Sequence, residues 1–201
     1  MRPPFFGQRT QMSRKQAIER YILLRLRVED IKRLSFLVEG LFHKTIGIPG
    51  DAPFSGTDLK DTIRTAFYGW FATLTDKDER AVYAFDPLLA LFPDKRAHII
   101  KVQIGCEVCH SPLQQFRNNV AFHSRSDLAA HIAARRRLIS GDTFLDLDSA
   151  RQDFFRLMDE LISEELHAIP ELPKVLGDLG VSHHPAFANV TSAETNKVSS
   201  C

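Results

Sequence analysis

The feature that most constrains the fold is the spacing of apolar residues after residue 13. They recur at helical spacings through residues 14–43, which is the pattern of an amphipathic α-helix. The positions are Ile18, Tyr21, Ile22, Val28, Ile31, Leu34, Val38 and Leu41. Ser13, with Gln16 three residues later, forms a capping-box pattern at the start. The sequence therefore predicts one long helix over residues 14–43.

Similar periodicity, together with capping residues and helix breakers, predicts further helices along the chain. We expect them at about 57–74, 76–85, 94–109, 112–123 and 127–139, and from 148 or 149 until Pro170. Pro87 and Pro93 are expected to interrupt the apolar segment 88–92, and Gly141 to close the helix at 127–139. No run alternates with the two-residue period of a strand, so an all-α fold is predicted.

The composition fits one folded domain. The chain has 201 residues, of which 44% are hydrophobic and 25% charged, a balance typical of globular proteins. A chain of this length buries about 70% of its unfolded surface. We expect a single helical bundle of about five to seven helices over residues 13–180. A flexible lead at 1–12 and a disordered tail at 181–201 would flank it.

Long apolar segments are missing from the sequence. No run of about 18 uncharged apolar residues occurs, so no membrane-spanning helix is expected. The first residues also lack the apolar stretch of a secretory signal. We therefore expect a cytoplasmic protein with reduced thiols and no membrane partner.

Charge is distributed unevenly, although the formal net charge is only +1. Residues 1–35 contain nine Lys and Arg against three Asp and Glu, and residues 117–140 contain five against one. Residues 141–180 contain ten Asp and Glu against three Lys and Arg. Two interpretations stay open, namely solvated helix faces or a basic surface that binds phosphates.

The segment 115–123 reads QFRNNVAFH and combines an arginine, two amides and a histidine. RNA cleavage without a metal needs a base for the ribose hydroxyl and an acid for the leaving oxygen. Histidine can serve as either, because it titrates near neutral pH. The negative charge that develops on the phosphate oxygens needs a cation, and a guanidinium binds it with paired hydrogen bonds. Arg117, Asn118 and His123 are therefore the candidate catalytic residues.

The spacing of Arg117 and His123 restricts how such a site is built. Six helical residues turn by about 600° and rise by about 9 Å, so the two side chains lie about 120° apart on a straight helix. Asn119 and His123, four residues apart, share a face. A working site needs Arg117 to reach around the helix, or the helix to end before His123. Alternatively, two copies of the motif meet across a two-fold axis.

Arg117-Asn118 followed by His123 resembles the R-x(4–6)-H motif of HEPN (higher eukaryotes and prokaryotes nucleotide-binding) domains. The segment is similar to the abortive-infection branch of that family. The resemblance implies a HEPN-like bundle, usually a homodimer, with endoribonuclease activity that needs no metal or other cofactor. It implies that Arg117 stabilises the phosphate, His123 acts as acid or base, and Asn118 assists. It also implies RNA as the substrate, an antitoxin as a partner protein, and a role in defence or toxin–antitoxin biology.

Further arginines follow the motif and are candidates for RNA binding. They are Arg125, Arg135, Arg136 and Arg137. Three consecutive arginines on a helix point in three directions, so at most two serve one surface. They are either exposed cations near a helix end or contacts to RNA phosphates. The alternative function is a non-catalytic helical bundle that binds a protein or a nucleic acid.

Cys106, Cys109 and His110 form a CxxCH pattern, which is typical of c-type haem attachment and also contains three zinc-binding residue types. Haem attachment requires export, and no second ligand pair follows to complete a zinc site. We therefore expect no cofactor and interpret the cysteines as reduced thiols, half-buried on a helix. The common nucleotide, hydride-transfer, esterase and zinc-protease motifs do not occur in the sequence.

Overall fold

The computed structural model describes residues 12–42, 56–74, 85–116, 129, 132–133 and 141–190. Throughout these residues the secondary structure is helical, without a strand, so the predicted all-α fold is confirmed. The elements are α1 (Arg14–Phe42), α2 (Gly56–Leu74), α3 (Phe85–Leu91), η1 (Pro93–Lys95), α4 (Arg96–Val108), α5 (His110–Phe116), α7 (Gly141–Ala168), α8 (Leu172–Asp178) and η3 (Pro185–Phe187).

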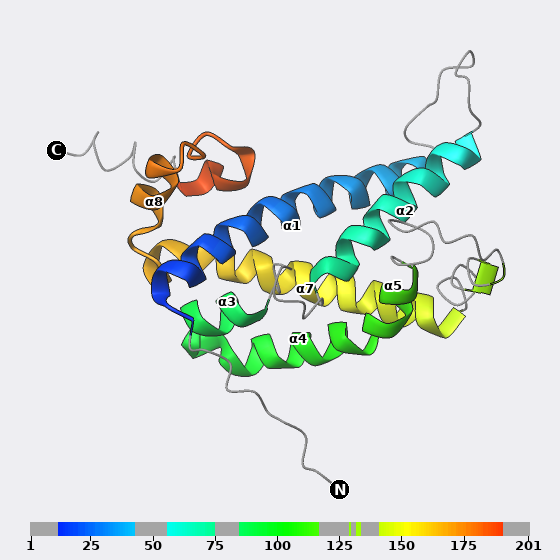
Figure 1. Ribbon diagram of the computed structural model, residues 1–201, viewed down its shortest axis with the longest axis horizontal. Coiled ribbons are helices and arrows are strands. Elements are labelled where there is room, and N and C mark those ends of the chain that lie inside the picture. Colours follow the sequence, from blue (N-terminus) through cyan, green and yellow to red (C-terminus); the bar gives the residue numbers. More distant parts are fainter. Residues whose placement is uncertain are drawn as a thin grey trace, which may run out of the picture.

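The helices form a bundle along one long axis (Figure 1). α1 and α7 run in opposite directions, α2 and α3 pack on α1, and α4 packs on α7. α5 follows α4 and packs against both α4 and α2. In Figure 1, α5 lies toward the end of the bundle at which α7 begins, whereas α8 and η3 lie at the opposite end.

The start of α1 confirms the predicted capping box. The Ser13 backbone N–H donates to Gln16 Oε1 at 3.1 Å, and the Gln16 N–H donates to Ser13 Oγ at 3.2 Å. Each side chain thereby satisfies a backbone donor that the first turn of a helix leaves without a partner.

Aromatic side chains join the helices in the core. The ring of Phe154 on α7 meets those of Phe71 on α2 and Phe85 on α3 edge to face, with centroids 6.3 and 6.0 Å apart. All three side chains are fully buried. Tyr21 on α1 packs against Phe92 at 5.6 Å. Such contacts combine apolar burial with a favourable ring geometry, and they link distant parts of the chain in one core.

Several helix boundaries differ from the prediction. Gly141 begins α7 instead of closing the preceding helix, so α7 starts seven residues before 148. The apolar segment 88–92, expected to be interrupted by Pro87 and Pro93, instead lies mostly within the helix α3. Pro87 is its third residue, where a missing N–H costs no helical hydrogen bond. The helices predicted at 76–85 and 127–139 fall almost entirely outside the described residues, as does the second half of the helix predicted at 112–123.

The prediction of a disordered tail from residue 181 is wrong for residues 181–190. This segment contains η3 and buries three apolar side chains, those of Ala186, Phe187 and Val190. It lacks helical periodicity, but these three residues are enough to pack it on the bundle. At the other end, Met12, predicted to be part of a flexible lead, packs partly buried against the core. Residues 1–11 and 191–201 lie outside the described part of the chain.

In the part of the chain that the structure describes, no helix has the length and apolar character needed to cross a membrane.

Candidate functional site

The predicted catalytic residues and the predicted RNA-binding arginines lie outside the described residues. They are Arg117, Asn118, His123, Arg125, Arg135, Arg136 and Arg137. The structure therefore neither brings them together nor separates them, and their roles stay predictions. The helices that flank them are described.

α5 leads directly into the motif. It ends at Phe116, the residue before Arg117, and Leu113 at its centre is fully buried. The Leu113 N–H donates to the Cys109 carbonyl oxygen at 3.2 Å, which carries the hydrogen bonding across the junction with α4. α5 also packs on α2. The chain thus enters the motif from a helix that is anchored in the core.

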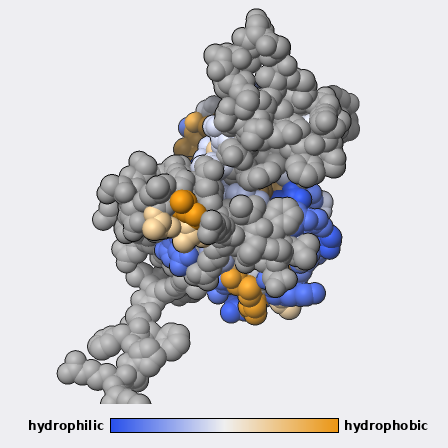
Figure 2. Space-filling model, turned by 90° about the vertical axis from the view of Figure 1, so that its right-hand side faces the viewer, coloured by the Kyte–Doolittle hydropathy of each residue, from blue (hydrophilic) through white to orange (hydrophobic). Residues whose placement is uncertain are grey.

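Segment 117–140 connects two helix ends on one side of the molecule. α5 ends before it and α7 begins after it at Gly141, and both helix ends lie toward the same end of the bundle (Figure 1). Figure 2 views the molecule from this end and shows hydrophilic side chains beside exposed apolar ones on its lower side, where α4 runs in Figure 1.

The two cysteines of the CxxCH pattern are buried thiols. Cys106 is fully buried, and its Sγ lies 3.8 Å from the Ala150 carbonyl oxygen, to which it donates. Burial raises the pKa of Cys106 to about 12, with a smaller contribution from Cys109. Burial, followed by the charge of Asp146, raises the pKa of Cys109 to about 11. A thiol binds zinc or attacks a substrate as the thiolate, so both environments oppose metal binding and nucleophilic chemistry.

The described side chains contain no group of three or more His, Cys, Asp or Glu residues that could hold a metal ion. The side chain of His110 lies outside this description. The expectation that the chain uses no metal therefore rests on the sequence and on the environment of the two thiols.

A buried ion pair joins α1 to α7, and the sequence reasoning did not predict it. Arg25 is 5% exposed and Glu165 is fully buried, and Arg25 Nη1 donates to Glu165 Oε2. Tyr21 Oη donates to the same oxygen at 2.6 Å. Burial and, secondarily, the negative charge of Glu165 raise the pKa of Tyr21, so its hydroxyl keeps its proton and remains a donor.

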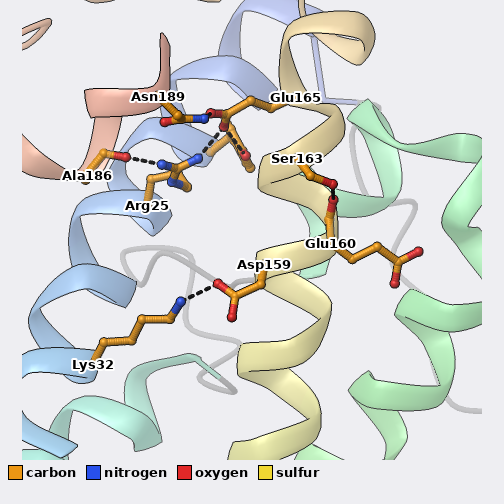
Figure 3. Close-up of polar contacts among 9 residues, drawn as sticks. Arg25, Lys32, Asp159, Glu160, Ser163, Glu165, Ala186 and Asn189 are labelled. Atoms are coloured by element: carbon orange, nitrogen blue, oxygen red, sulfur yellow. Dashed lines mark hydrogen bonds and ion pairs between the residues drawn. The ribbon is translucent and has the colours of Figure 1, made fainter. Parts of the chain in front are cut away.

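The residues after α8 complete this cluster (Figure 3). Asn189 Nδ2 donates to Glu165 Oε1 at 2.8 Å, and Arg25 Nη2 donates to the Ala186 carbonyl oxygen. The Arg25 guanidinium also lies over the Phe187 ring, 5.3 Å from its centroid. Among the described residues, no buried side-chain nitrogen or oxygen lacks a hydrogen-bond partner. The cluster is therefore internally satisfied and acts as a structural clamp.

The basic and acidic stretches of the sequence neutralise each other in part. Arg14 Nε lies 2.6 Å from Glu171 Oε1, and Lys32 on α1 pairs with Asp159 on α7. Arg14 holds the pKa of Glu171 below its ordinary value, chiefly through their hydrogen bond. Among the described residues, Arg14, Arg25 and Lys32 of the basic stretch 1–35 face carboxylates from 141–180. This part of the charge asymmetry stabilises the fold.

A second set of charges joins the start of α4 to α7. Lys95 Nζ lies 2.8 Å from Glu160 Oε1 and 2.7 Å from Glu164 Oε1, and His98 Nδ1 lies 3.0 Å from Glu160 Oε2. The hydrogen bond from Lys95 is the main cause of the lowered pKa of Glu160. These side chains are partly exposed, so the pairs contribute little to stability.

Comparisons of the chain with protein-family models, with curated proteins and with solved structures find no match.

Proposed function

We propose that this chain is a HEPN-like helical protein that cleaves RNA without a metal ion. Arg117 stabilises the charge that develops on the phosphate, and His123 transfers the proton as acid or base. Asn118 donates a hydrogen bond to a phosphate oxygen or orients His123. Arg125 and the arginines at 135–137 bind RNA phosphates.

The observation that carries the proposal is the place of the motif in an all-helical chain. Arg117 and Asn118 directly follow α5, whose residue Leu113 is fixed in the core. A site supported by an anchored helix positions its groups more closely than one on a free loop. The thiols of Cys106 and Cys109 are the competing chemistry in this region, and their raised pKa values oppose it.

The charge distribution also supports an RNA substrate. Of the two basic stretches, residues 1–35 use Arg14, Arg25 and Lys32 in pairs with carboxylates. Residues 117–140 hold five Arg against one Asp in sequence, and the motif lies within them. A local surplus of arginine attracts a polyanion even when the net charge of the chain is near zero.

The proposal includes a homodimer, because the turn between Arg117 and His123 separates them on one straight helix. Two motif copies across a two-fold axis would supply the groups that a single copy lacks. From the resemblance alone, we place the protein in the cytoplasm, in defence or toxin–antitoxin biology, with an antitoxin as partner.

The test is cleavage of varied RNAs by the purified chain in the presence of a chelator. We expect slow cleavage that Arg117→Ala and His123→Ala abolish. Arg156→Ala and His183→Ala are matched controls on exposed positions outside the motif and should retain activity. Sedimentation measures whether the active species is a dimer. Intact RNA at high protein concentration, or cleavage that both motif variants retain, would refute the catalytic proposal.

A second candidate is a bundle that binds a partner without turnover. Ile104 and Val108 on α4 favour it, because they lie one helical turn apart and are 60% and 65% exposed. Exposed apolar pairs of this kind suit a protein contact. This candidate predicts RNA binding that weakens with salt in polarisation assays, together with no cleavage in the same reactions.

A further inference from the structure

The residues after α8 form a strap, residues 181–190, across the bundle. It begins after Gly180, whose φ of +69° lies in the left-handed region that glycine adopts without strain. The Val181 N–H donates to the Leu176 carbonyl oxygen at 3.0 Å, which closes the end of α8. From there the strap reaches α1, against which η3 packs.

The strap has its own local hydrogen bonding. The Phe187 N–H donates to the His184 carbonyl oxygen at 2.9 Å, and the Ala186 N–H donates to His184 Nδ1 at 3.2 Å. Its apolar side chains, with Phe187 at the centre, pack into the core. These hydrogen bonds lie within the strap and do not involve the bundle.

Polar contacts between the strap and the bundle include those of Arg25 and Glu165. Arg25 donates to the Ala186 carbonyl oxygen, and Asn189 donates to Glu165 Oε1 (Figure 3). The Arg25 guanidinium also lies over the Phe187 ring. The ion pair itself needs no residue of the strap. Arg25 comes from α1 and Glu165 from α7.

This arrangement lets the strap lift without breaking the ion pair that joins α1 to α7. When the strap leaves, Arg25 and Glu165 remain paired, and Tyr21 still donates to Glu165. Water replaces Asn189 at Glu165 Oε1 and the Ala186 carbonyl at Arg25. Separating α1 from α7 would instead break the ion pair and expose the aromatic core, which costs far more free energy. Parts of a protein can open locally at free energies below that of global unfolding.

We propose that the strap opens about Gly180 as one unit while the helical bundle stays folded. The open state exposes the face of α1 and α7 that carries Tyr21, Arg25 and Glu165. Glu165 Oε1 is the point of control, because it is buried and bonded to Asn189 only while the strap is closed.

Hydrogen exchange on the full-length chain tests the proposal. The Ala186 and Phe187 amides should exchange roughly 100-fold or more faster than amides within α1 and α7, and with a weaker dependence on denaturant. Asn189→Ala removes a donor to Glu165 Oε1 that is present in the closed state only. It should therefore speed exchange of the strap amides by roughly ten- to a hundred-fold and leave those of α1 and α7 unchanged.

The control is Lys32→Ala, which removes an ion pair between α1 and α7 without touching the strap. This variant should not raise the exchange rate of the strap amides relative to that of the helix amides. If Asn189→Ala fails to fold, Phe187→Leu reduces the apolar contact of the strap and should give the same selective acceleration. Strap amides that exchange as slowly as those of the helices would overturn the proposal. So would an Asn189→Ala variant in which strap and helices accelerate equally.

Discussion

Replacing Arg25 by methionine removes the cation that faces the buried carboxylate of Glu165. Methionine keeps an unbranched side chain of comparable length, so the main change is the lost charge and its hydrogen bonds. Glu165 is fully buried, and water cannot take the place of the guanidinium while the bundle stays closed. Breaking a buried pair by removing one partner costs about 3–5 kcal/mol.

The structure places the expected cost at the lower end of that range. Tyr21 and Asn189 still donate to Glu165, at 2.6 and 2.8 Å. We therefore expect the free energy of unfolding to fall by about 3 kcal/mol, which for a chain of this size lowers Tm by about 6–12 °C. Adding Glu165→Gln to this variant removes the unpaired charge and should restore at least about 1 kcal/mol.

Urea unfolding followed by far-UV circular dichroism measures these differences. Lys32→Met is the matched control, because it deletes another α1–α7 ion pair whose side chains are 32% and 63% exposed. Exposed pairs contribute about 0–1 kcal/mol. An Arg25→Met variant that lowers the free energy of unfolding no more than Lys32→Met does would refute this reasoning. A double variant that is no more stable than Arg25→Met would refute it too, because Glu165 then does not depend on the charge of Arg25.

Three further predictions concern the junction of α4 and α5. Cys106 and Cys109 should react with a thiol reagent much more slowly in the folded chain than in urea, as mass spectrometry of the labelled chain would show. Because burial raises their pKa values to about 12 and about 11, the unfolded chain releases these protons first. The free energy of unfolding should therefore fall as pH rises above about 8.5, the ordinary pKa of a thiol. A free energy of unfolding that stays constant between about pH 8.5 and about pH 11 would contradict the raised pKa values of the two thiols. Leu113→Ala should cost about 2–5 kcal/mol and should also lower RNA cleavage per folded molecule, since α5 leads into the motif. Leu172→Ala, at an equally buried site in α8, should lose similar stability and keep its cleavage activity.

The long helices were predictable because their apolar residues follow one period over many turns. α1 begins within one residue of its predicted start, with the expected capping box. α2 likewise covers the predicted span. Burial of an apolar face determines that such segments form helices, so sequence and structure agree.

Proline and glycine misled the prediction of boundaries. Pro87 was interpreted as a helix breaker, but it lies in the first turn of α3, and Pro173 likewise lies in the first turn of α8. Proline is well tolerated there, because the first N–H groups of a helix have no intrahelical partner. Gly141 was interpreted as a helix end and is the first residue of α7. Proline and glycine thus indicate that a helix boundary is near, but they do not indicate whether the helix precedes or follows them.

The buried ion pair carried a sequence signal that was overlooked. Arg25 follows Tyr21 by four residues and precedes Val28 by three, so it lies on the apolar stripe of α1. Glu165 follows Leu161 by four residues on the stripe of α7. Two opposite charges on the apolar faces of two long helices predict a buried pair. The periodicity of the sequence could not predict the strap, because its contacts come from tertiary packing. The Arg117–His123 motif stays a prediction from the sequence.

The Arg25–Glu165 pair also has a consequence during synthesis of the chain. The two residues are separated by 140 positions, and a ribosome that adds about 5–20 residues per second needs about 7–28 s to make that distance. For most of this interval α1 is already synthesised, with an arginine on its apolar stripe and no Glu165 carboxylate to pair with it. That cation disfavours burial of the stripe against a wrong apolar partner, so α1 remains available until α7 emerges.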